Sequence, residues 1–304
     1  MQRQIEIIGA AWGLGGADPA CAEAPGVLAP LLAARLEECG VASAPGPMLR
    51  PGATERRKQF AVSKLCALLG SAVADACRRG RLPCVLGGDH SCAGGTWSGV
   101  ARTMGGNLGL LWIDAHMDSH TPGTSHTGRL HGMPLAWLLG QDDDPLYGLA
   151  SGVLLPQHVC IVGVRSFEPE EAERLDRLGV RVFHFEEVAR RGLDAVFAEA
   201  LAIVTRGTER FGVSIDLDVI TPQEVPHVGT PVAGGLSSAA LAQQLEPIAM
   251  HPGLAAVELV EYSPKHDMDG RSARVAVDLL AASLCGKSGG AQQQPKVVAN
   301  ALRR

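Results

Sequence analysis

Short apolar runs alternate with helical patterns along nearly the whole chain. The runs that have the length and character of buried strands are 5–12, 83–88, 108–113, 158–164, 180–185, 211–216 and 254–262. Helices are predicted over 24–40, 55–80, 91–103, 132–140, 168–178, 193–206, 237–249 and 271–285. Continuous apolar strands that alternate with helices indicate a parallel sheet covered on both faces.

Length and composition are consistent with this α/β pattern. The chain has 304 residues, of which 46% are hydrophobic and 19% charged, so it can bury a sizeable core. No linker divides the chain and no internal repeat is found. We therefore expect one domain over residues 1–286. The tail 287–304 turns polar and rich in Gly and Gln, and is predicted to be either a frayed end or an arm that packs on a neighbouring subunit.

The charge pattern limits the classes of partner. The net charge is -5, which predicts no nucleic-acid binding and no attraction to anionic membranes. The first residues lack a basic segment followed by a long apolar one, and no run of 18 apolar residues occurs, so we expect a cytoplasmic chain without signal peptide or membrane span. The 8 cysteines are scattered without CxxC pairs and are predicted to be small buried residues.

Polar clusters follow four of the predicted strands. "GGDHS" (87–91), "DAHMD" (114–118) and "DLD" (216–218) each come directly after an apolar run, as does Glu261. In a parallel α/β sheet these positions share one edge, at the carboxyl ends of the strands. Clusters more than a hundred residues apart in the sequence are therefore expected to converge.

The residue types in these clusters point to a metal site. Residues at i, i+2 and i+4 of an extended chain face the same side, so Asp114, His116 and Asp118 aim together, as do Asp216 and Asp218. With His90 they make four carboxylates and two imidazoles, and four negative charges balance two divalent cations. Without metal these carboxylates would repel one another.

The donor types also limit the choice of metal. The absence of cysteine argues against structural zinc, and the oxygen and nitrogen donors suit Mn²⁺, with Fe²⁺, Co²⁺ or Ni²⁺ as competitors. Taken alone, "GGDH" is typical of a turn and "DLD" is a weak signal. The hypothesis of a metal site rests on finding all three clusters at strand ends in one chain.

Six motifs carry a resemblance to a known family. "GGDHS", "DAHMDSHTP", "HGMP", "SIDLDVITP", "GTPVAGGL" and "VEYSP" occur in the order found in the ureohydrolases, which include arginase and agmatinase. They run from residue 87 to 264. The short N-terminus and the form "GTPVAGGL" look more like arginase than agmatinase.

The resemblance implies a three-layer α/β/α fold with a mainly parallel β-sheet and two Mn²⁺ per subunit. It also implies that Asp114, Asp118 and Asp216 occupy the positions of the family's bridging carboxylates. Family members hydrolyse a guanidino group to urea and an amine with a metal-activated water, and commonly form trimers or hexamers. The full set of implied ligands is His90, Asp114, His116, Asp118, Asp216 and Asp218.

The same resemblance suggests catalytic roles for residues beside the metals. Glu261 is expected to orient the planar guanidinium by its charge, with Glu258 a less favoured competitor. His131 in "LHGMP" matches the family's proton-shuttling histidine, although a histidine at a helix N-terminus is the plainer interpretation. Asp118 is a further candidate for relaying a proton, and Thr230 matches a residue that lines the guanidinium end.

Substrate choice is expected to depend on the loop 119–129, where the chain departs from arginases. It has His120, Thr127 and Arg129 where they typically carry Asn, Ser and Asn. Arg129 could pair with a substrate carboxylate, repel an α-ammonium group, or face solvent. Glu168 falls where the family places an acid that meets the α-ammonium, which favours arginine.

Several functions therefore remain open, in a definite order. Hydrolysis of L-arginine to L-ornithine and urea leads. A guanidino acid without the α-amino group, such as guanidinobutyrate or guanidinopropionate, is second, and agmatine is third. An inactive homologue that serves as a binding subunit, and a related deacetylase that uses a single zinc ion, are the alternatives outside this activity.

Overall fold

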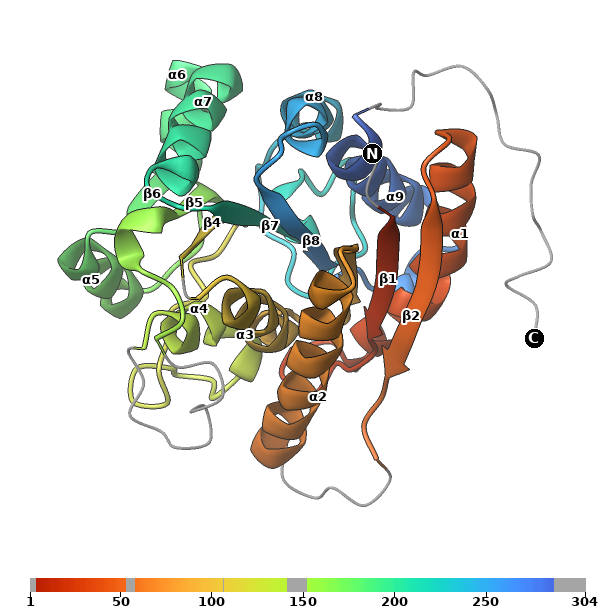
Figure 1. Cartoon of the computed structure of the whole chain (residues 1–304). Coiled ribbons are helices and arrows are strands. Elements are labelled where there is room, and N and C mark those ends of the chain that lie inside the picture. Colours follow the sequence, from red (N-terminus) through yellow and green to blue (C-terminus); the bar gives the residue numbers. More distant parts are fainter. Residues whose placement is uncertain (1–3, 53–57, 106, 141–151, 287–304) are drawn as a thin grey trace.

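An eight-stranded parallel sheet forms the centre of the computed structural model, which describes residues 4–52, 58–105, 107–140 and 152–286 (Figure 1). The strand order is β2-β1-β3-β8-β7-β4-β5-β6, and each neighbouring pair is parallel. The strands are β1 Ile5–Ala10, β2 Ser43–Leu49, β3 Leu82–Gly87, β4 Leu108–Ile113, β5 Val159–Val164, β6 Arg181–His184, β7 Arg210–Asp216 and β8 Leu254–Val260. The predicted α/β architecture is confirmed.

Helices cover both faces of the sheet and make three layers (Figure 1). One face carries α1 Ala24–Glu38, α6 Phe185–Arg191, α7 Leu193–Thr205, α8 Ser238–Ala249 and α9 Arg271–Cys285. The other carries α2 Lys58–Arg78, α3 Ala93–Thr103, α4 Pro134–Leu138 and α5 Pro169–Leu178. Alternate strand residues supply the two cores: Leu111 and Ile113 of β4 face the first, and Leu110 and Trp112 the second.

One strand and one α-helix of the described chain were not predicted. Strand β2, "SAPGPML", contains two prolines and a glycine, which hide it as a loop in the sequence. It lies at the edge of the sheet and pairs only with β1, and an edge strand tolerates residues that cannot donate to a neighbour. Helix α6 begins at Phe185, directly after β6, whereas the prediction extended that strand through 185. The predicted strands at 5–12 and 254–262 also end earlier, at Ala10 and Val260.

Helix α2 is long and apolar enough to cross a membrane, judged by length and composition alone. In this fold, however, half of its most apolar stretch is buried inside the protein. It packs closely on α3, because Gly95 and Gly99 leave room for its backbone. A Cβ at Gly95 would meet the carbonyl oxygen of Cys66 at 2.7 Å, and one at Gly99 would meet that of Gly70 at 2.6 Å. These contacts are those of a core helix.

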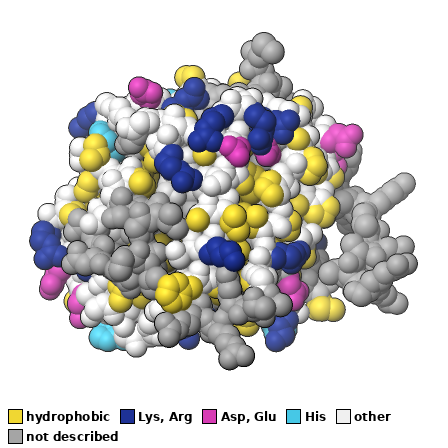
Figure 2. Space-filling view, turned by 60° about the horizontal axis from the view of Figure 1, so that its bottom comes forward, with side chains coloured by type: hydrophobic (Ala, Val, Ile, Leu, Met, Phe, Trp, Pro, Cys, Tyr) yellow, Lys and Arg dark blue, Asp and Glu magenta, His cyan; other side chains and the backbone are white. Residues whose placement is uncertain are grey.

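The described surface mixes charge types. Figure 2 shows Lys and Arg side chains on the face it brings forward, with acidic and apolar side chains between them. The predicted tail 287–304, and the start of the predicted helix at 55–57, lie outside the described residues. The domain boundary after residue 286 therefore stays a prediction.

Candidate metal centre

The four predicted polar clusters converge at the carboxyl ends of β3, β8, β7 and β4, which are consecutive in the sheet. The loop after β3 is held in place by Asp89, whose carboxylate accepts hydrogen bonds from the backbone N–H groups of Ser91 and Gly15, at 3.0 and 2.9 Å. Gly88 permits this turn, because a Cβ there would meet the carbonyl oxygen of Trp12 at 1.9 Å. The loop thereby directs His90 into the site.

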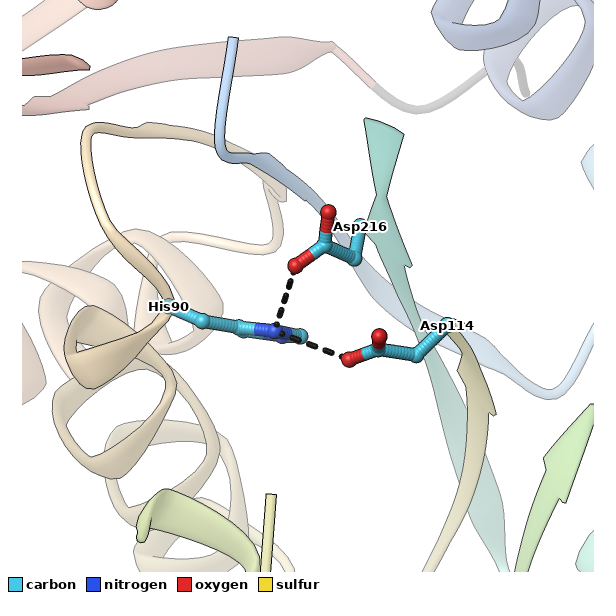
Figure 3. Close-up of side chains that lie close together, drawn as sticks. All are labelled: His90, Asp114 and Asp216. Atoms are coloured by element: carbon cyan, nitrogen blue, oxygen red, sulfur yellow. Dashed lines mark ion pairs between the residues drawn. The ribbon is translucent and has the colours of Figure 1, made fainter. Parts of the chain in front are cut away.

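The imidazole of His90 meets three carboxylates. Its Nδ1 lies 3.2 Å from Oδ2 of Asp114, 2.9 Å from Oδ2 of Asp118 and 3.2 Å from Oδ2 of Asp216. Figure 3 shows the ring of His90 pointing toward Asp114 and Asp216. This nitrogen is fully buried, yet no well-aligned hydrogen bond satisfies it in the described part of the chain. A buried nitrogen that faces converging carboxylate oxygens is suited to share a divalent cation with them.

A second group of the same kind adjoins the first. Nδ1 of His116 lies 3.5 Å from Oδ1 of Asp114 and 3.0 Å from Oδ2 of Asp218. The ligand atoms of His90, Asp114 and Asp216 lie close enough together to hold one ion, and so do those of Asp114, His116 and Asp218. Asp114 belongs to both groups, with Oδ2 toward His90 and Oδ1 toward His116. The residues present therefore fit two neighbouring cations that share one carboxylate.

Burial and mutual repulsion shift the titration of these groups strongly. Burial, reinforced by the charge of Asp114, raises the pKa of Asp118 to about 6. Burial and the charge of Asp218 raise the pKa of Asp216 well above its usual range. Burial alone would lower the pKa of His90, but its three carboxylate neighbours raise it well above normal. The protein has thus gathered more negative charge than it can hold without protons or cations.

Glu261 and His131 form a direct pair beside the metal residues. Oε1 of Glu261 lies 2.9 Å from Nδ1 of His131 and accepts a hydrogen bond of 2.8 Å from the backbone N–H of His90. Burial opposes the protonation of His131, but the charge of Glu261 raises its pKa to about 9. The opposite oxygen, Oε2, lies above Gly229, where a Cβ would come within 2.0 Å of it. Gly229 thus leaves this oxygen room.

The backbone is unusual at two of these positions. Asp118 and Glu261 adopt positive φ angles, 47° and 64°, and they are the non-glycine residues that do so in the described chain. In Glu261 this conformation is held by its N–H, which donates to the carbonyl of Gly88 at 2.8 Å, and its carbonyl, which accepts from the N–H of Gly229 at 2.9 Å. Left-handed conformations outside glycine cluster at functional sites.

A cleft of about 190 Å³ joins these residues to solvent. The predicted residues that line it are His116, Asp118, His120, Thr127, Arg129, His131, Glu168, Asp216, Asp218, Thr230 and Glu261. His90 and Asp114 lie buried behind this wall. Oγ1 of Thr230 is buried and has no hydrogen-bond partner in the described part of the chain, so it is free to meet a bound polar group.

The mouth of the cleft carries an acid pair and a basic loop. Nε2 of His120 lies 3.0 Å from Oε2 of Glu168 and 3.3 Å from Oε2 of Glu171. Glu168 and Glu171 also form a capping box that starts α5. In the loop 119–129, Oγ1 of Thr127 accepts a hydrogen bond of 3.3 Å from the backbone N–H of Arg129. Arg129 itself is exposed.

A sequence model of the Arginase family matches residues 16–286. The chain belongs to the arginase family. It is 40% identical over 214 residues to the arginase of Brevibacillus brevis, and the match covers 70% of this chain and 72% of the relative. The family membership confirms the resemblance drawn from the six motifs.

Solved structures of the arginase family share the fold. The native arginase of Bacillus caldovelox superposes with a TM-score of 0.88 at 34% identity, over 95% of this chain and 100% of that one. The arginase of Entamoeba histolytica, solved in complex with L-ornithine, gives a TM-score of 0.87 at 27% identity, over 94% and 99% of the two chains. By family, the chain is therefore a hydrolase that acts on guanidino groups.

Glu258, the competitor considered for Glu261, does not reach the cleft of this arginase-family chain. It is fully buried and accepts hydrogen bonds from Nε1 of Trp97 at 3.1 Å and from Oγ of Ser214 at 2.8 Å, with Thr96 as a third donor. Of the two acids, Glu261 is the one that lines the cleft, and its role toward substrate stays a prediction. Glu258 supports the metal residues from behind.

Two supporting residues of the arginase-family site were missed in the sequence. Nε1 of Trp112 donates to Oδ2 of Asp114 at 2.8 Å, and its ring stacks on His90 at 4.2 Å between centroids. Oγ of Ser214 lies 3.0 Å from Nε2 of His90. Both stand two residues before a ligand on the same strand face, and this alternation is the signal that could have found them. Glu171 was also missed, because its place in a helical pattern looks like that of a surface acid, whereas the structure buries it against His120 and the backbone N–H of Ser119.

Proposed function

We propose that this chain hydrolyses L-arginine to L-ornithine and urea at a centre of two Mn²⁺ ions. The single observation that carries the proposal is the pair of histidine–carboxylate groups joined by Asp114. Its relatives named arginases, and the complex of the Entamoeba histolytica arginase with L-ornithine, support arginine as the substrate.

The metals would be held by the six residues described above. His90, Asp118 and Asp216 face one position, His116 and Asp218 the other, and Asp114 both. Two divalent cations, when bound there, lower the pKa of water and supply a nucleophile at neutral pH. Oxygen and imidazole donors without thiolate suit Mn²⁺ among the first-row metals.

The remaining residues would bind and protonate the substrate. Oε2 of Glu261 would hold the guanidinium, because Oε1 is taken by His131 and the N–H of His90, whereas Oε2 has only a weak donor, the thiol of Cys21 at 3.8 Å, among the described residues. Thr230 offers an unpaired hydroxyl in the same cleft of the described chain. A protonated His131 would donate its proton to the amine as it leaves, and its pairing with Glu261 raises its pKa and so favours that protonated form. Asp118 remains a candidate for relaying a proton from the attacking water.

Other parts of the proposal concern the whole assembly. The partner is a small guanidino molecule, and a homo-oligomer, trimeric or hexameric by family analogy, is expected in the cytoplasm. These statements rest on the family and the composition, and sedimentation of the full chain would test the oligomeric state.

The deciding experiment is urea release from manganese-loaded enzyme given L-arginine, with the metal content counted in the same sample. We expect two metal ions per chain and urea and ornithine in equal amounts. Two bound metals without urea from arginine or other guanidino compounds would favour an inactive binding homologue. One bound zinc ion would favour the deacetylase alternative.

A further inference from the structure

A single arginine side chain, and no lysine, lies among the described residues that line the cleft. Arg129 is the one Lys or Arg in that lining, and it also borders a neighbouring hollow of about 560 Å³ that reaches Lys58. In the described part of the chain its guanidinium makes no ion pair or hydrogen bond, although its backbone N–H is tied to Thr127. An exposed guanidinium at the mouth of a cleft can form paired hydrogen bonds with a carboxylate.

The acids at the same mouth already have a hydrogen-bonding partner. His120 contacts both carboxylates, at 3.0 Å to Glu168 and 3.3 Å to Glu171. Glu171 further accepts hydrogen bonds from the backbone N–H groups of Ser119 and Glu168, at 3.0 and 3.2 Å. Nδ1 of His120 is held 3.1 Å from Oγ1 of Thr124, which fixes the ring in this position. An α-ammonium group entering the cleft therefore meets Glu171, whose two oxygens already accept hydrogen bonds, and Glu168, whose Oε2 contacts His120 while 49% of its side chain stays exposed.

These two observations favour recognition of the carboxylate over recognition of the amine. A carboxylate gains a charge-assisted contact with Arg129. An α-ammonium has to compete with His120 for the two acids and lies near the like charge of Arg129. The distal end of the cleft is thus asymmetric: the guanidinium of Arg129 has no partner among the described residues, whereas both acids already contact His120.

We infer that this chain hydrolyses ω-guanidino carboxylic acids as a class, including those that lack an α-amino group, with Arg129 as the carboxylate anchor. The inference rests on the proposed hydrolysis of a guanidino group. In the reaction, water adds its oxygen to the guanidinium carbon and the bond from that carbon to the alkyl nitrogen breaks. Both protons of the water end on the departing alkyl nitrogen. The products are neutral urea and an alkylammonium, which here belongs to an ω-amino acid.

The test compares kcat/KM for urea release from L-arginine, 5-guanidinopentanoate, 4-guanidinobutyrate, 3-guanidinopropionate and agmatine, with the manganese-loaded full chain. We expect the best deaminated acid to lie within about tenfold of arginine, and agmatine to fall roughly ten- to a hundredfold below both, the worth of a charge-assisted hydrogen bond. A deficit of more than about tenfold for every deaminated acid overturns the inference while leaving arginine hydrolysis intact. Absence of urea from all of these compounds instead refutes the proposed function.

Two variants separate the roles of the loop and the acid pair. Arg129→Gln is expected to lower kcat/KM for arginine and the deaminated acids roughly ten- to a hundredfold and not to lower it for agmatine, which has no carboxylate. His120→Asn releases the acids and is expected to raise the preference for arginine over 5-guanidinopentanoate by about tenfold or more. Arg177→Gln, an exposed substitution on α5, is the matched control. Equal losses on agmatine in Arg129→Gln, or an unchanged preference in His120→Asn, would contradict the assignment.

Direct binding gives a readout that does not depend on turnover. Glutarate, a dicarboxylate without a guanidino group, should inhibit the wild type competitively and lose affinity in Arg129→Gln but not in Arg177→Gln. Inhibition by glutarate that is the same in both variants would place the carboxylate contact elsewhere and overturn the role of Arg129.

Discussion

The hydroxyl of Ser214 lies 3.0 Å from Nε2 of His90. Because the same hydroxyl donates to Glu258 at 2.8 Å, it can only accept from the imidazole, and Nε2 must carry the proton. In the neutral imidazole Nδ1 then keeps a lone pair directed at the three carboxylates, where a cation can replace the proton. The buried chain from Glu258 through Ser214 thus selects the tautomer of His90 that can bind a cation.

Glu258→Gln should weaken this selection. The amide can donate to Ser214 and so reverse the hydrogen bond, and we expect metal affinity to fall about ten- to a hundredfold, as is typical when a supporting partner of a ligand is changed. Competition with a fluorescent chelator measures the affinity. Glu6→Gln is the matched control, because Glu6 is also buried but pairs with Arg79 and Arg81 away from the site. A drop in metal affinity of equal size in both variants would point to general destabilisation.

Trp112→Phe removes one hydrogen bond and keeps the ring. The indole N–H that donates to Asp114 at 2.8 Å is lost, while an aromatic ring remains to stack on His90. We expect both metal positions to weaken together, by roughly tenfold, because Asp114 faces both. Calorimetric titration of the metal-free chain with Mn²⁺ resolves the two steps. Weakening of one step alone would show that Asp114 is not shared.

Asp118→Ala and Asp218→Ala should each remove one metal and nearly all turnover. Asp118 contacts His90 and Asp218 contacts His116, so the two variants disable different positions. Metal counting and urea release on the same preparations test this. Asp75→Ala is the control, since Asp75 forms an exposed ion pair with Arg78 on α2. Full activity with two bound metals in either cleft variant would remove that residue from the ligand set.

Glu261→Gln should retain the metals but bind substrate poorly, with a rise in KM of roughly ten- to a hundredfold from the lost charge. It should also change the pH profile. Glu261 raises the pKa of His131 to about 9, so the protonated form persists below that pH and is lost above it. Without the carboxylate charge the pKa falls, and the alkaline limb of the profile moves to lower pH. An unmoved alkaline limb would assign it to another group.

Periodicity predicted most of this centre, because its residues obey two simple geometric rules. The ligands lie at strand ends, where the chain is polar after an apolar run, and the parallel topology brings those ends together. Ser214 and Trp112 escaped notice because they lie inside apolar runs and look like core residues. The pairing of His131 with Glu261 spans 130 residues and depends on loop conformation, which no periodicity records. Strand β2 escaped because its prolines are tolerated only through its edge position.

The positive φ angles at Asp118 and Glu261 place two residues of this centre in conformations that lower the stability of the fold. Glycine would adopt both conformations without the steric cost, which is of order 1–3 kcal/mol for a side chain held in such a region. Selection for thermal stability alone, without selection for turnover, would therefore favour glycine at these two positions. Glycine there would remove two side chains to which the proposed catalysis assigns roles.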